Sequence, residues 1–217
     1  MKKWRWMLLS LIANFLVINN GAHAVSLDAN TLNAITLEKL QQRFAHQPVV
    51  RAHFTQVRQI QGMPKPLHSN GEMLVSQQKG LWWHQQKPFP LTLVLDDRRM
   101  VQVMSGQAPQ IITADSNPQL FQFNHLMRAL FQADRAVLEE NFKLEFSALG
   151  QEKWRLVLTP KTSPLDKLFT TITLNGQTNL DAILLIDRQG DRTELSFTQH
   201  QLKPETLSHE EEEHFKF

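Results

Sequence analysis

Residues 71–104 read GEMLVSQQKGLWWHQQKPFPLTLVLDDRRMVQVM, and this stretch decides the fold. Apolar side chains recur in it at every second position, which is the period of a strand with one buried face. They are Met73 and Val75, then Leu81 and Trp83, then Leu91, Leu93 and Leu95. Turn signals at residues 77–80 and 96–99 separate the runs. The pattern predicts a meander of antiparallel strands whose apolar face must be covered.

What covers that face decides the function. A face filled by the protein's own side chains is a core, whereas a face left partly unfilled is a ligand cavity. Methionine, which adapts to ligands of variable shape, is frequent here and in the following helix, at Met73, Met100, Met104 and Met127. Because methionine also fills gaps in ordinary cores, the residues alone leave both interpretations open.

The first 24 residues have the composition of a secretory signal peptide. A basic start is followed by an apolar run over residues 7–18 and by Ala22-His23-Ala24, the small-x-small pattern that signal peptidase cuts. The apolar run is shorter than the roughly 20 residues that a membrane-spanning helix needs. We therefore expect residues 1–24 to be removed and residues 25–217 to form a single domain.

Composition narrows the classes of function. Without the three leader cations, 20 of the 23 lysines and arginines remain against 21 acidic residues. Nucleic acids and anionic membrane surfaces require a concentrated positive field, so neither is an expected partner. The sequence has no cysteine, which excludes disulfides, thiol catalysis and a lipid-modified N-terminal cysteine. An export signal without disulfides indicates a bacterial periplasmic protein, and we expect a monomer.

The rest of the chain is predicted to extend the sheet and add helices. One amphipathic helix, capped by Asn30 or Thr31, would carry Leu32, Ile35, Leu40 and Phe44, and others are predicted over residues 116–131 and 133–141. Residues 62–70 are expected to form a loop. Further strands are predicted at 49–60, 109–113, 142–146, 154–159, 170–174, 182–186 and 194–202. This order fits an α+β fold, mainly antiparallel β, in which helices cover the concave face of a strongly curved sheet or open barrel.

No motif for catalysis or metal binding is apparent. The tail His209–His214 places its two histidines five positions apart, a spacing that does not put both on one helical face. We interpret it as a solvated charged connector. The sequence has no Gly-x-Ser-x-Gly elbow and no glycine-rich phosphate loop. We therefore expect no enzymatic activity, no metal site and no cofactor.

Several short motifs, in their order along the chain, resemble the LolA-like periplasmic lipoprotein carriers. Ala52-His53-Phe54-Thr55-Gln56 is similar to that family's Phe-x-Gln first strand, and residues 71–83 are similar to its Gly-x-hydrophobic strand pair ending in tryptophan. Leu156–Lys161 is similar to its Leu-Thr-Pro-Lys strand end. Residues 190–193 and the closing residues 215–217 also correspond. The resemblance extends over nearly all of residues 25–217.

The resemblance implies an unclosed half β-barrel with helices as a lid and a hydrophobic cavity that shields acyl chains. By position, the cavity residues would be Val50, Ala52, Phe54, Met73, Val75, Leu81, Trp83, Leu93 and Met104. The lid would contribute Leu126, Met127 and Leu130. An inner-membrane transporter as donor and an outer-membrane acceptor are the implied partners.

Two departures from the family bear on the cargo. Gln77 stands where lipoprotein carriers have an arginine that hydrogen-bonds the lid shut, and a neutral amide makes no charge-assisted bond. The chain also stops at Phe217, without the family's C-terminal extension. The expected function is a periplasmic carrier for acyl chains of lipoproteins or a related apolar lipid, such as a glycolipid or polyene lipid. The alternative is an envelope scaffold that uses the same sheet for protein contacts.

Overall fold

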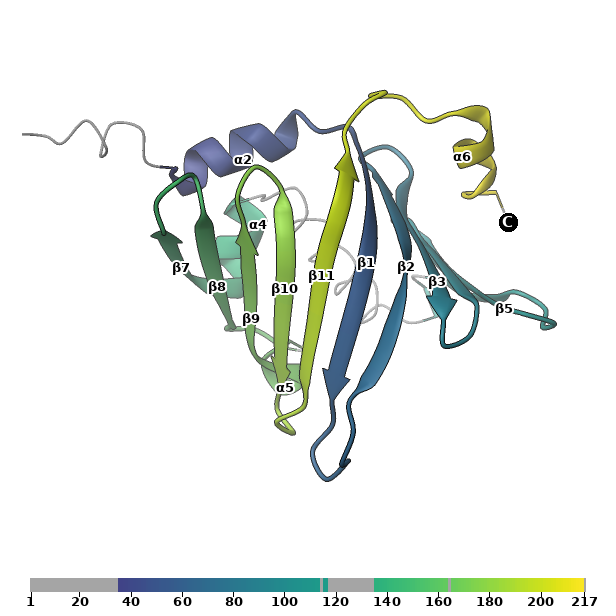
Figure 1. The fold of residues 1–217 in the computed structure, drawn as a ribbon, viewed down its shortest axis with the longest axis horizontal. Coiled ribbons are helices and arrows are strands. Elements are labelled where there is room, and N and C mark those ends of the chain that lie inside the picture. Colours follow the sequence, from purple (N-terminus) through teal and green to yellow (C-terminus); the bar gives the residue numbers. More distant parts are fainter. Residues whose placement is uncertain (1–34, 114, 117–134, 164, 217) are drawn as a thin grey trace, which may run out of the picture. The chain divides into compact units, whose positions relative to one another are not determined.

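The computed structural model describes residues 35–113, 115–116, 135–163 and 165–216. Their centre is one sheet of eleven strands in the order β6-β5-β4-β3-β2-β1-β11-β10-β9-β8-β7 (Figure 1). Every strand pairing is antiparallel. Strands β6 and β7 are the two edges and do not pair with each other, so the sheet is not closed. The predicted fold, mainly antiparallel and unclosed, is confirmed.

The strand bounds agree with the predicted meander. The strands are β1 (Val49–Gln59), β2 (Leu67–Ser76), β3 (Gly80–Lys87), β4 (Leu91–Leu95), β5 (Arg99–Met104), β6 (Gln110–Thr113), β7 (Phe142–Ala148), β8 (Trp154–Pro160), β9 (Phe169–Gly176), β10 (Leu180–Asp187) and β11 (Arg192–Gln201). Several strand ends differ from the prediction by one or two residues. The largest error is at residues 67–70, which were predicted as loop and instead pair with β1. Most of these residues are polar or exposed, so they lack the apolar alternation that identified the other strands.

The described helices are α2 (Leu37–Ala45), α4 (Arg135–Asn141), α5 (Leu165–Leu168) and α6 (His209–Glu213). Helix α2 begins later than predicted, because the side chain of Thr36 accepts a hydrogen bond from Lys39 N at 3.2 Å and caps it. Ile35 therefore precedes the helix, where it is buried together with Leu40. The residue before a helix cap and the residue four positions after the cap often pack together in this way. Their contact fixes the direction in which the chain enters the helix. The predicted caps, residues 30–31, lie outside the described residues.

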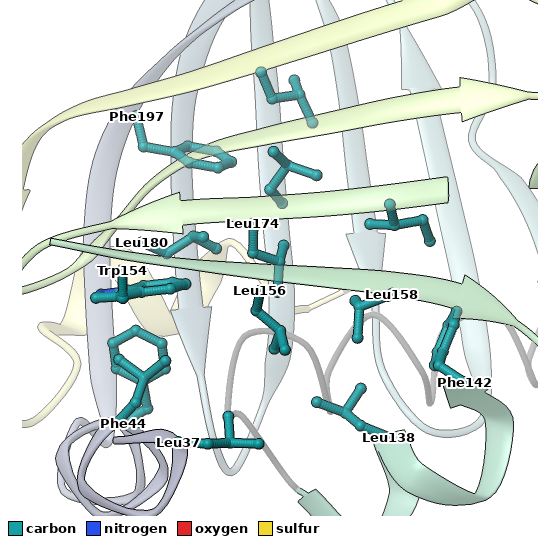
Figure 2. Packing of buried hydrophobic residues seen from close by; sticks show 14 of the residues in the cluster. Leu37, Phe44, Leu138, Phe142, Trp154, Leu156, Leu158, Leu174, Leu180 and Phe197 are labelled. Carbon is teal, nitrogen blue, oxygen red and sulfur yellow. The ribbon is translucent and has the colours of Figure 1, made fainter. Parts of the chain in front are cut away.

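The two faces of the sheet carry separate apolar clusters. The concave cluster includes Leu37, Leu40 and Phe44 of α2 and Leu138 of α4, packed on Trp154, Leu156 and Leu158 of β8 (Figure 2). Its other buried members are Ile35, Ala52, Phe54, Met73, Phe142, Leu165, Ile172, Leu174, Leu180, Ile183, Leu195 and Phe197. The convex cluster consists of Val49, Leu74, Val94, Val101 and Phe215. Helical side chains thus cover the concave face, as predicted.

The C-terminal tail is a docked helix, so its interpretation as a solvated connector was wrong. Ser208 and Glu211 form a reciprocal capping box at the start of α6. The guanidinium of Arg51 in β1 bonds both carboxylate oxygens of Glu211, with Nη2 to Oε2 at 2.7 Å. Phe215 is buried in the convex cluster. The partners Arg51 and Glu211 are 160 residues apart in the chain, and no local pattern shows that they meet.

Gly71 allows β2 and β3 to approach closely. A Cβ at this position would lie 1.9 Å from the carbonyl oxygen of His84 in β3. We expect Gly71→Ala to lower the free energy of unfolding by about 1–3 kcal/mol, measured by chemical denaturation, because the strands must separate. Ser69→Ala is the control in the same strand. It removes a buried hydroxyl that has no partner among the described residues, so stability should be unchanged or higher. Equal losses in both variants would contradict the close approach.

The docking of α6 should depend on pH. Hydrogen bonds from Arg51 lower the pKa of Glu211 from 4.5 to about 2. Because the pKa is lowered in the folded state, the stabilisation is complete well above pH 4.5 and disappears as the pH falls through about 2. The difference corresponds to at most about 3 kcal/mol.

We expect Glu211→Gln to lower the free energy of unfolding by about 1–3 kcal/mol at pH 7 and by less than half as much at pH 3. Denaturant unfolding at the two pH values measures this difference. The control Glu210→Gln alters an exposed neighbour on the same helix and should leave stability unchanged at both. A loss for Glu211→Gln that is the same at pH 7 and pH 3 would refute the ion-pair explanation.

Candidate functional site

Seven of the residues predicted to line a cavity lie together on the concave face. Strand β1 contributes Val50, Ala52 and Phe54 at alternate positions, and its pairing with β2 and β3 continues the row. Residues directly opposite in an antiparallel pair share one face. The pairs are Val50 with Val75, Ala52 with Met73, Val75 with Leu81, and Met73 with Trp83. The structure therefore forms one apolar surface across three neighbouring strands.

This surface is largely covered by the protein's own side chains. Ala52, Phe54 and Met73 are 3%, 1% and 4% exposed and belong to the concave cluster. The other four residues are half buried against the same cluster: Val50, Val75, Leu81 and Trp83. Within the described part of the chain, the surface is thus closer to a core than to an open cavity.

Two aromatic rings meet on this surface. Phe54 of β1 and Trp83 of β3 stack with their ring centroids 3.6 Å apart and an interplanar angle of 25°. Gly71 of β2 is the residue opposite Phe54, and it has no side chain, so the rings can meet across it. Trp83 is half buried, whereas Phe54 is buried. A molecule entering this face would change the surroundings of Trp83.

A small pocket remains between the end of α2 and the ends of four strands. Its volume is about 30 Å³, about a tenth of the smallest typical ligand sites. The lining residues are Phe44, Gln47, Val50, Met73, Val75, Gln77, Asn179, Leu180, Phe197 and His200. Four of them, Val50, Met73, Val75 and Gln77, were predicted as site residues. The pocket is too small for an acyl chain unless neighbouring groups move.

Gln77 connects the end of β2 to the end of α2. Its Nε2 donates to the carbonyl oxygens of Ala45 at 3.2 Å and Gln47 at 3.3 Å. Its backbone N–H donates to the carbonyl of Pro48 at 2.9 Å. Gln77 therefore holds the C-terminal end of α2 on the sheet. Its predicted contact with the lid residues Leu126, Met127 and Leu130 is untested, because these lie outside the described residues.

Arg43 makes further polar contacts between α2 and the turns at the end of the sheet. Arg43 Nη1 donates to the carbonyl of Gln177 at 3.0 Å, and Nη2 lies 3.4 Å from the carboxylate of Glu152, which is exposed. Figure 1 shows α2 crossing the end of the sheet where these turns lie. The Phe44 ring packs edge-on against Trp154, with centroids 5.9 Å apart (Figure 2). Apolar packing and hydrogen bonds together hold this helix in place.

The remaining two predicted cavity residues are placed by strand register. Leu93 is opposite Trp83, and Met104 is opposite Leu91. Both are half buried and share the concave face, farther from the pocket. Neither lines the pocket described above.

Sequence reasoning missed six of the ten residues that line the pocket, Gln47 among them. Phe44 was identified only as part of a helical stripe, and Leu180 was not singled out. Phe197 belonged to a predicted strand, yet nothing local indicated that β11 lies beside β1. Asn179 and His200 were missed because a turn asparagine and a single histidine are usually structural.

The groups around the pocket are suited to binding. Its walls are apolar side chains and amides, and the one titratable lining residue is His200. The described residues contain no group of three or more acidic or histidine side chains placed to hold a metal. No helix within the described ranges is long and apolar enough to cross a bilayer.

Comparisons with solved structures give distant likenesses. A LolA superfamily protein from Nitrosomonas europaea is 11% identical, with a TM-score of 0.45, over 82% of this chain and 97% of that one. A domain named for outer-membrane lipoprotein sorting, from Vibrio parahaemolyticus, is 8% identical, with a TM-score of 0.43, over 80% and 93%. A chain of the MucA/MucB complex of Pseudomonas aeruginosa is 18% identical, with a TM-score of 0.33, over 76% and 55%. All three TM-scores are below 0.5, so these likenesses carry no argument.

Comparison of the amino-acid sequence with protein families gives a stronger result than comparison with solved structures. No curated protein matches this chain. Residues 29–198, well over half of the chain, match the family described as "Outer membrane lipoprotein carrier protein LolA-like". The resemblance of the strand motifs is thereby confirmed, and the chain belongs to this LolA-like family.

Proposed function

We propose that this protein is a periplasmic carrier that binds acyl chains of lipoproteins, or a related apolar lipid, and transfers them from the inner to the outer membrane. The observation that carries the proposal is the apolar surface shared by β1, β2 and β3, which α2 covers at one end. Membership in the LolA-like family supports this class of function. The proposed ligand site consists of the nine predicted cavity residues together with the pocket beneath α2.

Binding requires groups to move, because the existing pocket is about 30 Å³. Helix α2 is one covering element that can leave without breaking a strand pairing. Its departure would open the pocket that Phe44 shares with Val50, Met73 and Val75 to an incoming chain. Met73, which is flexible and lines the pocket, can adapt to chains of different shape.

The free energy gained by burying the side chains of α2 is similar in size to that gained by burying an acyl chain. Burial of Leu37, Leu40 and Phe44 stabilises the α2 contact by roughly 5–9 kcal/mol gross, at about 1.5–3 kcal/mol per side chain. The exposed Arg43–Glu152 pair adds about 0–1 kcal/mol. An acyl chain of about sixteen carbons gains on the order of 10 kcal/mol gross when shielded from water. The apolar burial that holds α2 and the apolar burial that cargo would supply are therefore of comparable size, as an exchange of one for the other requires.

The carrier would act between two membranes. Residues 1–24 would direct export and be removed, leaving a monomeric periplasmic protein. Its cargo would come from an inner-membrane transporter and pass to an outer-membrane acceptor. Shielding needs no cofactor, because burial of apolar surface alone supplies the affinity.

One observation favours a second function. The concave surface is largely filled, as in a protein whose core is purely structural. An envelope scaffold would use the sheet for protein contacts and would take up no lipid. Lipid binding at the concave face separates the two functions.

The first prediction uses Trp83 as a reporter. In residues 25–217, a variant with Trp82 and Trp154 replaced by phenylalanine retains Trp83 alone. We expect lipid or an apolar dye to change its fluorescence, because cargo would disturb the Phe54–Trp83 stack. The matched variant that retains only Trp82, whose ring stacks on His214 of the C-terminal tail, should not respond. A silent Trp83 under conditions in which lipid binds would place the site elsewhere, and absence of binding would favour the scaffold.

The hydrogen bonds from Gln77 to the end of α2 should control the rate of lipid exchange. In Gln77→Arg, a cation would meet the carbonyls at the C-terminal end of α2, where the helix dipole favours positive charge. A charge-assisted bond exceeds a neutral one by about 1 kcal/mol, so lipid exchange should slow about fivefold, and Gln77→Ala should accelerate it. Gln78→Arg adds the same charge at an exposed neighbour and should have no effect. Stopped-flow transfer of a fluorescent lipid measures the rates; unchanged rates in both Gln77 variants would show that α2 does not gate the site.

A further inference from the structure

The hairpin formed by β1 and β2 carries exposed apolar side chains at its tip. Seven large apolar side chains are exposed among the described residues, and three of them are Val57, Met63 and Leu67. Their exposed fractions are 37%, 41% and 48%. Leu67 lies opposite Arg58 at the end of the strand pairing, and Met63 lies in the connecting turn. Figure 1 shows this turn extending beyond the turn between β10 and β11. The sheet therefore projects an apolar tip into solvent.

The backbone of this tip is fixed by its own hydrogen bonds. The N–H of Met63 donates to the carbonyl of Ile60 at 3.1 Å, and Gln59 Nε2 donates to the carbonyl of Met63 at 3.1 Å. Gly62 has a φ of +81°, a conformation that glycine adopts without strain. The turn therefore has a defined shape, and it holds the side chain of Met63 in an exposed position.

A buried carboxylate fastens the hairpin to the turn between β10 and β11. Asp191 is 6% exposed. Its Oδ1 accepts from the backbone N–H of Gln61 at 3.0 Å, and its Oδ2 accepts from Arg58 Nη2 at 3.2 Å. These bonds hold the tip in its projecting position. Exposed apolar groups that are held together on a surface are typical of a contact with a protein or a membrane.

The charge of the tip favours a membrane with anionic lipids. Residues 39–71 contain no aspartate or glutamate, and Lys65 and His68 are exposed beside Met63 and Leu67. The charge of residues 25–217 as a whole is near zero, which argued against an anionic surface, but no acid within the hairpin offsets its cations. Cations near a membrane are attracted by anionic headgroups, and apolar side chains beside them enter the boundary between headgroups and acyl chains.

We propose that the tip of the β1–β2 hairpin docks this protein on a membrane surface that carries anionic lipid headgroups. Met63 and Leu67 would enter the apolar boundary, and Lys65 would lie at the lipid phosphates. The tip is at the opposite end of β1 and β2 from Gln77, which holds α2. Docking would therefore leave α2 unobstructed. This contact is separate from the site proposed to hold cargo.

Sedimentation of residues 25–217 with lipid vesicles measures the docking. We expect binding to vesicles of phosphatidylethanolamine and phosphatidylglycerol that weakens with added salt. The double variant Met63→Ser/Leu67→Ser should bind about tenfold more weakly, because it loses the apolar groups that enter the membrane. Lys65→Gln should bind these vesicles about fivefold more weakly and should not alter any binding to phosphatidylcholine.

Leu149→Ser is the matched control. Leu149 is 51% exposed, like the residues of the tip, but it lies in the turn between β7 and β8 at the other end of the sheet. Vesicle binding should be unchanged in this variant. Circular dichroism checks the fold of every variant.

A label gives the position of the contact directly. The chain has no cysteine, so Met63→Cys and Leu149→Cys can each carry a dye whose fluorescence reports an apolar environment. We expect anionic vesicles to shift the emission of the dye to shorter wavelength at position 63 and to leave it unchanged at position 149.

Three results would overturn the docking. They are no binding of the wild type to anionic vesicles, equal binding of the wild type and the double variant, and equal losses in the double variant and Leu149→Ser. The first would leave the tip to contacts with a protein. Uptake of an apolar dye by the double variant in the absence of vesicles should match the wild type. Failure of docking is thereby distinguished from failure of the carrier function, which would abolish dye uptake in both proteins.

Discussion

The structure depends on one apolar contact, in which the face of α2 and the concave face of the sheet hide each other from water. Leu40 and Phe44 are 1% and 4% exposed, and Trp154 beneath them is 1% exposed. Neither surface could remain bare in water, because each exposed apolar side chain costs about 1.5–3 kcal/mol. A lipid chain offers the sheet the same kind of partner. An apolar cover over an apolar face is therefore exchangeable in a way that a hydrogen-bonded cover is not.

In the proposed carrier, the sheet would lose that cover while contacts on its other face hold the strands. The convex cluster includes Phe215, which follows α6, and the Arg51–Glu211 pair fastens the same helix to β1. Trp82 adds a stack on His214 with ring centroids 4.3 Å apart. These contacts join β1 and β3 to the C-terminal segment, beyond residues 29–198 that match the family. In the proposed carrier, they would keep the strands of the site in register while the concave face changes partners.

Local periodicity accounts for the part of the fold and site that the sequence predicts. Alternation in β1 to β4 places Ala52, Met73 and Trp83 on one face, and strand register confirms it. Long-range pairing could not be predicted in this way. Strand β11 pairs with β1, and this pairing brings Phe197 and His200 to the pocket. No local pattern in either segment indicates the pairing. The charged tail was misread for the same reason, since its partner Arg51 lies in a distant strand.

The most direct test of the central claim measures whether α2 leaves the sheet when lipid binds. The chain has no cysteine, so Gln42→Cys on α2 and Thr55→Cys on the convex side of β1, both at exposed positions, can each take a spin label. Pulsed electron resonance then gives the distribution of distances between the labels. With saturating lipid we expect a second, longer distance to dominate. An unchanged distribution in a protein that demonstrably holds lipid would contradict the exchange of α2 for cargo.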